Sequence, residues 1–159
     1  MFEGYPKLAK LTDQTVVTLR LMTKNDQQIL VDFFQRIPED DHIFFRDDVS
    51  KPCTVLSWIE ELDCERVLPL LALVDGRVVG DATLHRQPIG WTHHLGRVRL
   101  TIDPQFRRKG LGGLLIGELI LIGKGLKLER LVVEVMEDPT SVEACPNSCE
   151  TEPISARAL

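Results

Sequence analysis

The sequence predicts one mixed α/β domain in which helices flank a sheet, with the element order β-α-α-β-β-β-α-β. The chain has 159 residues, the usual length of a single domain. Short apolar or β-branched runs alternate with segments whose apolar residues recur every three or four positions. A tight-turn sequence joins two of the apolar runs, as in an antiparallel hairpin. We expect one domain over 1–159, with its core at 15–137 and an irregular tail at 138–159.

The first predicted elements are a strand and two helices. Thr15–Met22 is short and rich in β-branched residues, which favour strands. Thr23 is a suitable N-cap, and apolar residues at helical spacing predict a helix over Lys24–Gln35, which Pro38 terminates. A second helix is predicted at Thr54–Leu62, where the apolar residues again share one face.

The sequence of the second half of the core region predicts four strands and one helix. Val67–Val74 and Val78–Leu84 are apolar runs joined by an Asp-Gly-Arg turn, which favours antiparallel pairing. Arg97–Asp103 alternates polar and apolar residues, as a strand with one buried face does. A glycine-rich turn then leads into a helix over Leu111–Ile122 and a last strand over Leu128–Met136.

Composition and charge argue against several functional classes. The net charge is -5, which disfavours binding to nucleic acid through the overall field. No apolar stretch is long enough for a membrane span and no signal peptide is visible, so we expect a cytoplasmic protein without membrane contact. The cysteines lack Cys-x-x-Cys spacing, which predicts free thiols and no metal site. They are Cys53, Cys64, Cys145 and Cys149.

The segment that carries chemistry is 103–113, Asp-Pro-Gln-Phe-Arg-Arg-Lys-Gly-Leu-Gly-Gly. It lies between a predicted strand and a predicted helix. Glycines allow successive peptide N–H groups to point into one concavity, and the start of a helix adds unpaired donors. With three adjacent cations, the turn predicts a site for a polyphosphate ligand. The alternative is a solvated basic loop, and neither a Walker nor a dinucleotide-binding glycine pattern is present.

This turn resembles the signature of the GNAT superfamily of acyl-CoA-dependent N-acyltransferases, Arg/Gln-x-x-Gly-x-Gly/Ala. Residues 107–112, Arg-Arg-Lys-Gly-Leu-Gly, match it position by position after an Ile-Asp-Pro lead-in. The predicted element order is similar to that family from Thr15 to Met136. The resemblance implies a GNAT-like mixed-sheet fold. It also implies an N-acetyltransferase that moves an acetyl group from acetyl-CoA directly to a primary amine, without a covalent enzyme intermediate.

The resemblance further implies where acetyl-CoA binds. In the family, the backbone amides of the turn hold the diphosphate. The residues implied for it are Arg107, Arg108, Lys109, Gly110, Leu111 and Gly112. The pantetheine pairs with the strand before the turn, where that strand and the last one diverge. The residues implied for the pantetheine and acyl part are Leu100, Thr101 and Ile102.

Direct transfer also needs a group that accepts the amine proton. The position that lysine-acetylating relatives use aligns with Arg97, which cannot accept a proton. The candidates are therefore titratable side chains on nearby strands and loops, for each of which an ordinary solvated side chain is the alternative. They are Glu134, His93 and His94, with His85 and Asp81 ranked below them.

The stretch 39–48, between the first two predicted helices, is acidic and contains one Lys or Arg, Arg46. In the family this loop frames the acceptor site, and its carboxylates would concentrate a cationic amine. We therefore predict that the acceptor is a small cationic amine or a protein lysine, the alternative being a solvated acidic loop. The acidic residues are Glu39, Asp40, Asp41, Asp47 and Asp48.

The sequence after the last predicted strand departs from the family. Asp138 stands where an Asn is usual, Cys145 falls near the position of a Tyr that protonates the departing thiolate, and the final strands are not recognisable. An exposed sheet edge would follow, which predicts a homo-oligomer. Two alternatives therefore stay open: a catalytically impaired acyl-CoA binding or sensing module of the same fold, and an unrelated nucleotide-phosphate binding domain.

Overall fold

A computed structural model of the chain describes residues 4–39, 47–49 and 51–134. Its centre is a six-stranded sheet with strand order β1-β2-β3-β4-β5-β6. The strands are β1 (Lys7–Lys10), β2 (Val16–Leu21), β3 (Val67–Val74), β4 (Arg77–Arg86), β5 (Leu95–Ile102) and β6 (Arg130–Glu134). Neighbours pair antiparallel up to β5, and β6 joins parallel to β5.

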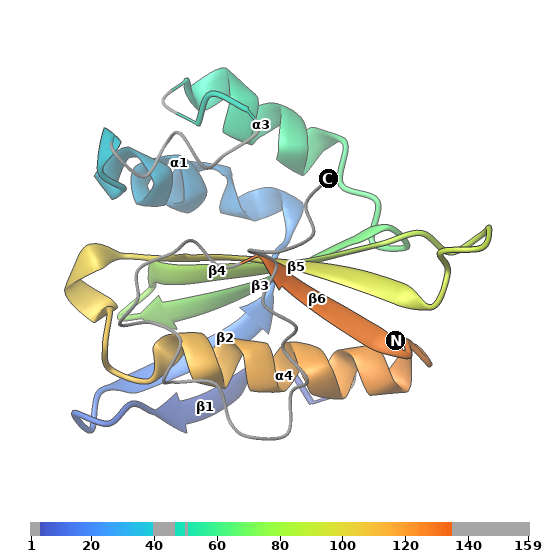
Figure 1. The fold of residues 1–159 in the computed structure, drawn as a ribbon. Helices are drawn as coiled ribbons and strands as arrows, with labels where there is room; N and C mark the ends of the chain where they lie inside the picture. The colour runs from blue at the N-terminus through green and yellow to red at the C-terminus, as the bar shows by residue number, and fades with distance from the viewer. Residues whose placement is uncertain (1–3, 40–46, 50, 135–159) are drawn as a thin grey trace.

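Helices cover both faces of this sheet (Figure 1). One face carries α1 (Gln27–Arg36), which follows the 3₁₀ turn η1 (Lys24–Asp26), and α3 (Pro52–Glu60). The other face carries α4 (Leu111–Gly125), which follows the 3₁₀ turn η2 (Pro104–Phe106). The fold is therefore the mixed α/β arrangement that the sequence predicts.

The predicted elements are all present among the described residues, with shifted ends. The predicted hairpin between β3 and β4 is confirmed, and its turn places Asp75 and Gly76 at φ of 50° and 77°. The final strand is described only as far as Glu134.

The N-terminal strand β1 was not predicted, so the predicted element order lacks its first member. Its sequence, Lys-Leu-Ala-Lys, holds no apolar run, and Leu8 is 76% exposed. The segment becomes a strand because it pairs antiparallel with β2, from Lys7 opposite Leu19 to Lys10 opposite Val16. That pairing is a tertiary contact at the sheet edge, where lysines are common because they discourage further strand addition.

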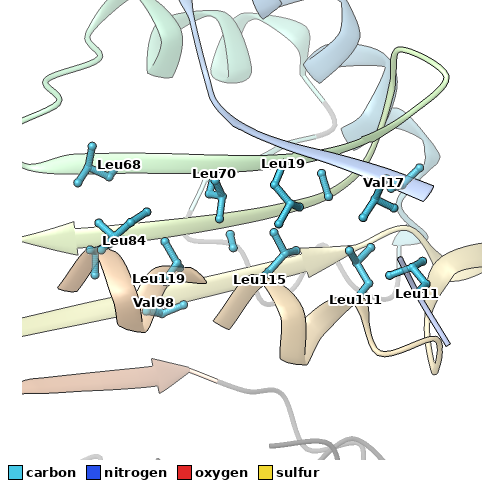
Figure 2. Close-up of a cluster of buried hydrophobic side chains, with 14 residues drawn as sticks. Leu11, Val17, Leu19, Leu68, Leu70, Leu84, Val98, Leu111, Leu115 and Leu119 are labelled. Atoms are coloured by element: carbon cyan, nitrogen blue, oxygen red, sulfur yellow. The ribbon is translucent and has the colours of Figure 1, made fainter. Parts of the chain in front are cut away.

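The larger core lies between the sheet and α4 (Figure 2). Leu111, Leu115 and Leu119 recur every four residues and are almost fully buried, so one helix face points at the sheet. They meet apolar side chains of the central strands, among them Leu70 and Leu84. Each fully buried leucine stabilises the fold by about 2 kcal/mol, which holds α4 against β4 and β5.

A second core joins α1 and α3 to the opposite face. Phe33 and Phe34 of α1 are buried with Val55 and Ile59 of α3. The Phe34 ring lies edge-on to Trp58, with 5.7 Å between the ring centroids. The two helices therefore pack on each other as well as on the sheet, and their positions relative to the strands are tied together.

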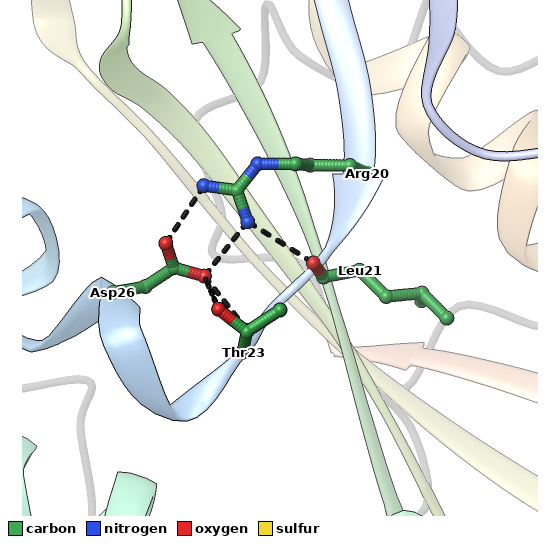
Figure 3. Close-up of polar contacts among 4 residues, drawn as sticks. All are labelled: Arg20, Leu21, Thr23 and Asp26. Atoms are coloured by element: carbon green, nitrogen blue, oxygen red, sulfur yellow. Dashed lines mark hydrogen bonds and ion pairs between the residues drawn. The ribbon is translucent and has the colours of Figure 1, made fainter.

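A partly buried ion pair lies at the start of α1 (Figure 3). Arg20 of β2 donates two hydrogen bonds of 2.7 Å to the carboxylate of Asp26, and its Nη1 also reaches the Leu21 carbonyl. The same carboxylate accepts hydrogen bonds from the backbone N–H and the hydroxyl of Thr23. Burial alone would raise the pKa of Asp26, but the bonds from Arg20 and Thr23 outweigh it and lower that pKa.

Replacing Asp26 by alanine is expected to destabilise the fold by about 2 kcal/mol at pH 7, because Arg20 loses its buried partner. Because the pKa of Asp26 is lowered in the fold, its stabilisation is present above the unfolded pKa of about 4 and is lost as the pH falls through the folded value. Urea unfolding at pH 7 and pH 3 should therefore show a deficit that shrinks in acid. Asp32→Ala, at an exposed position of α1, is the matched control and should stay within about 0.5 kcal/mol.

Candidate active site at the turn after β5

The turn between β5 and α4 presents open backbone donors. Gly110, immediately before α4, has a φ of 82°, a conformation that side chains with a Cβ rarely adopt. The first helical hydrogen bond runs from the Leu114 N–H to the Gly110 carbonyl, 3.1 Å. Within the described residues, the N–H groups of Leu111, Gly112 and Gly113 donate to no protein acceptor. These donors, at the positive end of the helix dipole, suit a phosphate group.

The β1–β2 hairpin holds this turn in place. The Lys109 carbonyl accepts hydrogen bonds from the Thr12 N–H, 3.1 Å, and the Thr12 hydroxyl, 3.0 Å. Lys109 Nζ lies 3.0 Å from the Asp13 carboxylate and 5.0 Å from the centroid of the Phe106 ring. Lys109 thus stabilises the conformation of the turn and also contributes to its positive charge. The sequence did not predict this contact, since β1 itself was not predicted.

A buried carboxylate anchors the beginning of the turn. Asp103 is 2% exposed, and its side chain accepts from the Gln105 N–H at 3.0 Å. Arg36 Nε of α1 donates to it at 3.2 Å, and Arg77 of β4 lies at 3.5 Å. Arg36 also donates to the Val78 carbonyl at 2.6 Å. The turn is therefore fastened to the helical layer and to the sheet at once.

Beside this turn, the backbone at 100–102 of β5 has one side without a partner strand among the described residues, and we call it the open edge. The β5–β6 pairing ends with Arg99 opposite Glu134, so among the described residues 100–102 pair only with β4. The absence of a side chain at Gly112 lets α4 approach this segment closely. A Cβ there would lie 3.2 Å from Ile102 Cδ1 and 3.3 Å from Leu100 Cδ2. The open edge and the open amides therefore lie next to each other.

A cavity of about 260 Å³ lies between the sheet and helices α1 and α3, and we call it the helix–sheet cavity. Its helical wall is mainly apolar and includes Phe34 and Trp58, with Asp47 and Glu61 as its acidic members. Its floor is formed by polar side chains at alternate positions of β4 and β5, which point to the same face of the sheet. They are Asp81, Thr83, His85, Arg99 and Thr101.

Asp81 is the perturbed acid of this cavity. Burial raises the pKa of Asp81 to about 7, against the opposing effect of Thr83, whose hydroxyl lies 3.2 Å from both carboxylate oxygens. On sequence alone, Asp81 ranks below the other candidates for proton transfer. The available signal was an acidic residue in the middle of an otherwise apolar strand, but only the covering helices show how that acid is surrounded.

The two histidines ranked among the first candidates for proton transfer lie away from the helix–sheet cavity. His93 and His94 sit in the loop before β5, and the turn follows the far end of that strand. Their rings lie 5.7 Å apart, and His93 Nδ1 is 2.7 Å from the Gly90 carbonyl. Neither histidine lines the helix–sheet cavity. Glu134 is placed by its backbone opposite Arg99. Catalytic roles for these three residues stay predictions.

The acidic segment is described only in part. Asp47 lines the helix–sheet cavity and accepts a hydrogen bond from Trp58 Nε1 at 3.1 Å. Asp48 forms an ion pair with Lys51, and Glu39 is exposed. Outside the described residues lie Asp40, Asp41, Arg46, Asp138, Cys145 and Cys149.

Three other features bear on the chemistry available to the described part of the chain. It contains no group of three or more His, Cys, Asp or Glu side chains placed to hold a metal ion. None of its helices combines the length and the apolar character needed to cross a membrane. Cys53 and Cys64 are exposed free thiols.

Comparisons with known proteins found a matching family profile and solved structures of similar fold. The profile of a family described as "Acetyltransferase (GNAT) family" matches residues 28–145. The GNAT domain of S. lividans PAT superposes with a TM-score of 0.75 at 15% identity, over 87% of this chain and 83% of that one. A GNAT-family acetyltransferase from Streptococcus pneumoniae gives 0.66 at 20% identity, over 80% of each chain.

A third solved structure, ribosomal-protein-alanine N-acetyltransferase from Brucella melitensis, gives a TM-score of 0.63 at 20% identity, over 79% of each chain. At these identities the solved structures show that the fold is shared, and they do not identify the substrate of this chain. Among curated proteins, none matches the chain significantly.

Proposed function

Because the chain belongs to the acetyltransferase (GNAT) family, whose chemistry is acyl transfer, we propose that it moves an acetyl group from acetyl-CoA to a primary amine. The observation that carries the proposal is the set of open amides at the start of α4 beside the open edge of β5. A diphosphate and an extended amide-containing chain, joined in one molecule, fit these two features.

Different residues of the turn and of β5 would bind different parts of acetyl-CoA. The N–H groups of Leu111 and Gly112 would hold the diphosphate, with the positive charges of Arg107 and Arg108 at its rim. The free side of the β5 backbone at 100–102 would pair with the pantetheine amides as an added strand would. Gly110 would shape the turn, and Lys109 would hold it through Thr12 and Asp13.

The acceptor is proposed to enter from the other face of β5. Thr101 lines the helix–sheet cavity, while its backbone belongs to the open edge. An amine in that cavity would reach the thioester across a single strand. The same cavity favours an enzyme over a module that only binds acyl-CoA. Acyl transfer requires a second binding site for the acceptor and a titratable group beside it, whereas binding of acyl-CoA alone requires neither.

Calorimetric titration with coenzyme A and acetyl-CoA, followed by a thiol-release assay with a set of primary amines, tests this proposal. We expect 1:1 binding of both molecules and thiol release that depends on an added amine. Binding without release for every amine would contradict the enzyme and favour the binding module. Complete displacement of coenzyme A by ATP would favour the nucleotide-phosphate domain instead.

We further propose that the chain forms a homo-oligomer through the outer edge of β6, which has no partner strand among the described residues. Light scattering at micromolar concentration is expected to give at least twice the mass of 18.0 kDa. A monodisperse monomer would contradict this expectation.

A further inference from the structure

We propose that Asp81 is the general base of the transfer, and that the helix–sheet cavity binds the acceptor as a primary ammonium on a short apolar arm. This inference rests on the proposed function and adds to it a proton acceptor and a substrate class. It concerns a residue on β4, one strand away from the position that the family alignment assigns to the base.

Register places Asp81 beside the expected reaction centre. Asp81 pairs with Thr101 across β4 and β5, and both side chains line the helix–sheet cavity. Thr101 belongs to the open edge of β5, where the thioester is proposed to lie. Neighbouring strands are about 4.8 Å apart, so the Asp81 backbone lies one strand spacing from β5 and two spacings, roughly 10 Å, from a pantetheine paired with the open edge. An amine in the helix–sheet cavity would lie between the carboxylate and the thioester.

The cavity wall suits a cation on an apolar arm. The rings of Phe34 and Trp58 supply apolar surface and faces that attract a cation. Asp47, bonded to Trp58 Nε1, adds a carboxylate at the same wall. A volume of about 260 Å³ equals roughly nine water molecules, so it admits an arm of about that many non-hydrogen atoms. Both a lysine side chain and a free arylalkylamine meet this description.

Asp81 is poised to change its protonation state at neutral pH. Burial raises its pKa to about 7, and the Thr83 hydroxyl opposes that rise. The lining residues from α1 and β3 are apolar. The charged or titratable groups that share the cavity with Asp81 come from β4, β5 and the segments just before and just after α3. They are His85, Arg99, Glu61 and Asp47. Among the charged or titratable groups of the cavity, Asp81 is the residue that pairs directly opposite Thr101.

The proton and electron balance is simple. The Asp81 carboxylate takes one proton from the ammonium, and the neutral amine then donates its lone pair to the thioester carbon. The carbon–nitrogen bond forms, the carbon–sulfur bond breaks, and the sulfur leaves with the bonding pair. A second proton passes from nitrogen to sulfur, and Asp81 returns its proton to solvent. No oxidant, reductant or further reactant is required.

Asp81→Asn is the direct test, because asparagine keeps the size of the side chain and an oxygen that can accept from Thr83. We expect kcat to fall by about 100-fold with an unchanged Kd for acetyl-CoA. The wild-type kcat should rise with pH through about 7, and this rise should be absent in the variant. Asp32→Asn, at an exposed position of α1, is the control and should match the wild type.

Stability supplies a readout independent of activity. Because the pKa of Asp81 is raised in the fold, ionisation of Asp81 destabilises the folded state. This destabilisation is absent near pH 4 and is complete once the pH has risen through about 7. Asp81→Asn should therefore have a higher unfolding midpoint than the wild type at pH 8 and an equal one near pH 4. A variant that is less stable than the wild type at pH 8 would overturn the proposed burial of an ionised base.

A second variant acts on the pKa and leaves Asp81 in place. Thr83→Val keeps the shape of the side chain but removes the hydroxyl that lowers the pKa of Asp81. The rise in kcat should then move to higher pH. An unshifted rise, or Asp81→Asn with wild-type kcat, would overturn the assignment of the base. The proposed function would survive either result, whereas wild-type protein that binds acetyl-CoA but acetylates no amine would refute the function itself.

The substrate class is tested with 2-phenylethylamine, a capped lysine peptide and spermidine. Acetylation of either of the first two supports the apolar-arm class and identifies its source as a free amine or a protein. Acetylation of spermidine alone, a longer and fully cationic chain, would overturn that class while leaving Asp81 to be judged by its own variants.

Discussion

Replacing Gly110 by valine is expected to weaken coenzyme A binding by about 100- to 1,000-fold. Gly110 has a φ of 82°, which a β-branched residue does not adopt without strain, and a Cβ there would lie 3.3 Å from Thr12 Cγ2. The turn must then rotate, and the Leu111 and Gly112 amides turn away from the diphosphate. Losing one or two charge-assisted hydrogen bonds costs about 3–4 kcal/mol, which corresponds to that loss of affinity.

Gly112→Val should act on the same site by a different route. Its side chain would press on Leu100 and Ile102, which carry the open edge of β5. Gly117→Ala is the matched control, because a Cβ at Gly117 meets nothing within 4 Å and the residue lies in the same helix. That variant should bind coenzyme A normally and be more stable by about 0.5–1 kcal/mol. Calorimetry on folded protein gives the affinities, and a normal affinity for Gly110→Val would refute the assigned diphosphate site.

Asp103→Ala is expected to lower the free energy of unfolding by about 3 kcal/mol and to weaken coenzyme A binding as well. The carboxylate is 2% exposed and serves both Arg36 and Arg77. Its removal leaves Arg36, whose side chain is 27% exposed, without its buried partner. The Gln105 N–H loses its acceptor too, so the start of the turn is no longer fastened.

Urea unfolding measures the first effect and calorimetry the second. Asp103→Asn should be milder, since an amide oxygen can still accept from Gln105 while the ion pairs are lost. Glu60→Ala, at an exposed position of α3, is the control and should change stability by no more than about 0.5 kcal/mol. Wild-type stability for Asp103→Ala would show that the two arginines find equivalent partners.

Local sequence determined most of the fold, because the relevant signals act between near neighbours. Asp75-Gly76 adopts the left-handed conformations of its hairpin turn, and the leucines of α4 recur at the spacing that buries one helix face. By contrast, β1 contains two lysines and an exposed leucine, and it becomes a strand only because β2 offers it hydrogen bonds. No pattern within four residues could predict that pairing.

The candidate site divides in the same way. The glycines and cations of 107–112 predict an anion-binding turn, because a left-handed residue and unpaired helical amides follow from local chain geometry. Proton transfer is different. Asp81 reads as one acidic residue in an apolar strand, and its raised pKa arises only when α1 and α3 cover that face of the sheet. The sequence therefore determined the backbone that would bind the cosubstrate, and only the tertiary structure decided which side chain is desolvated, because desolvation depends on neighbours distant in the chain.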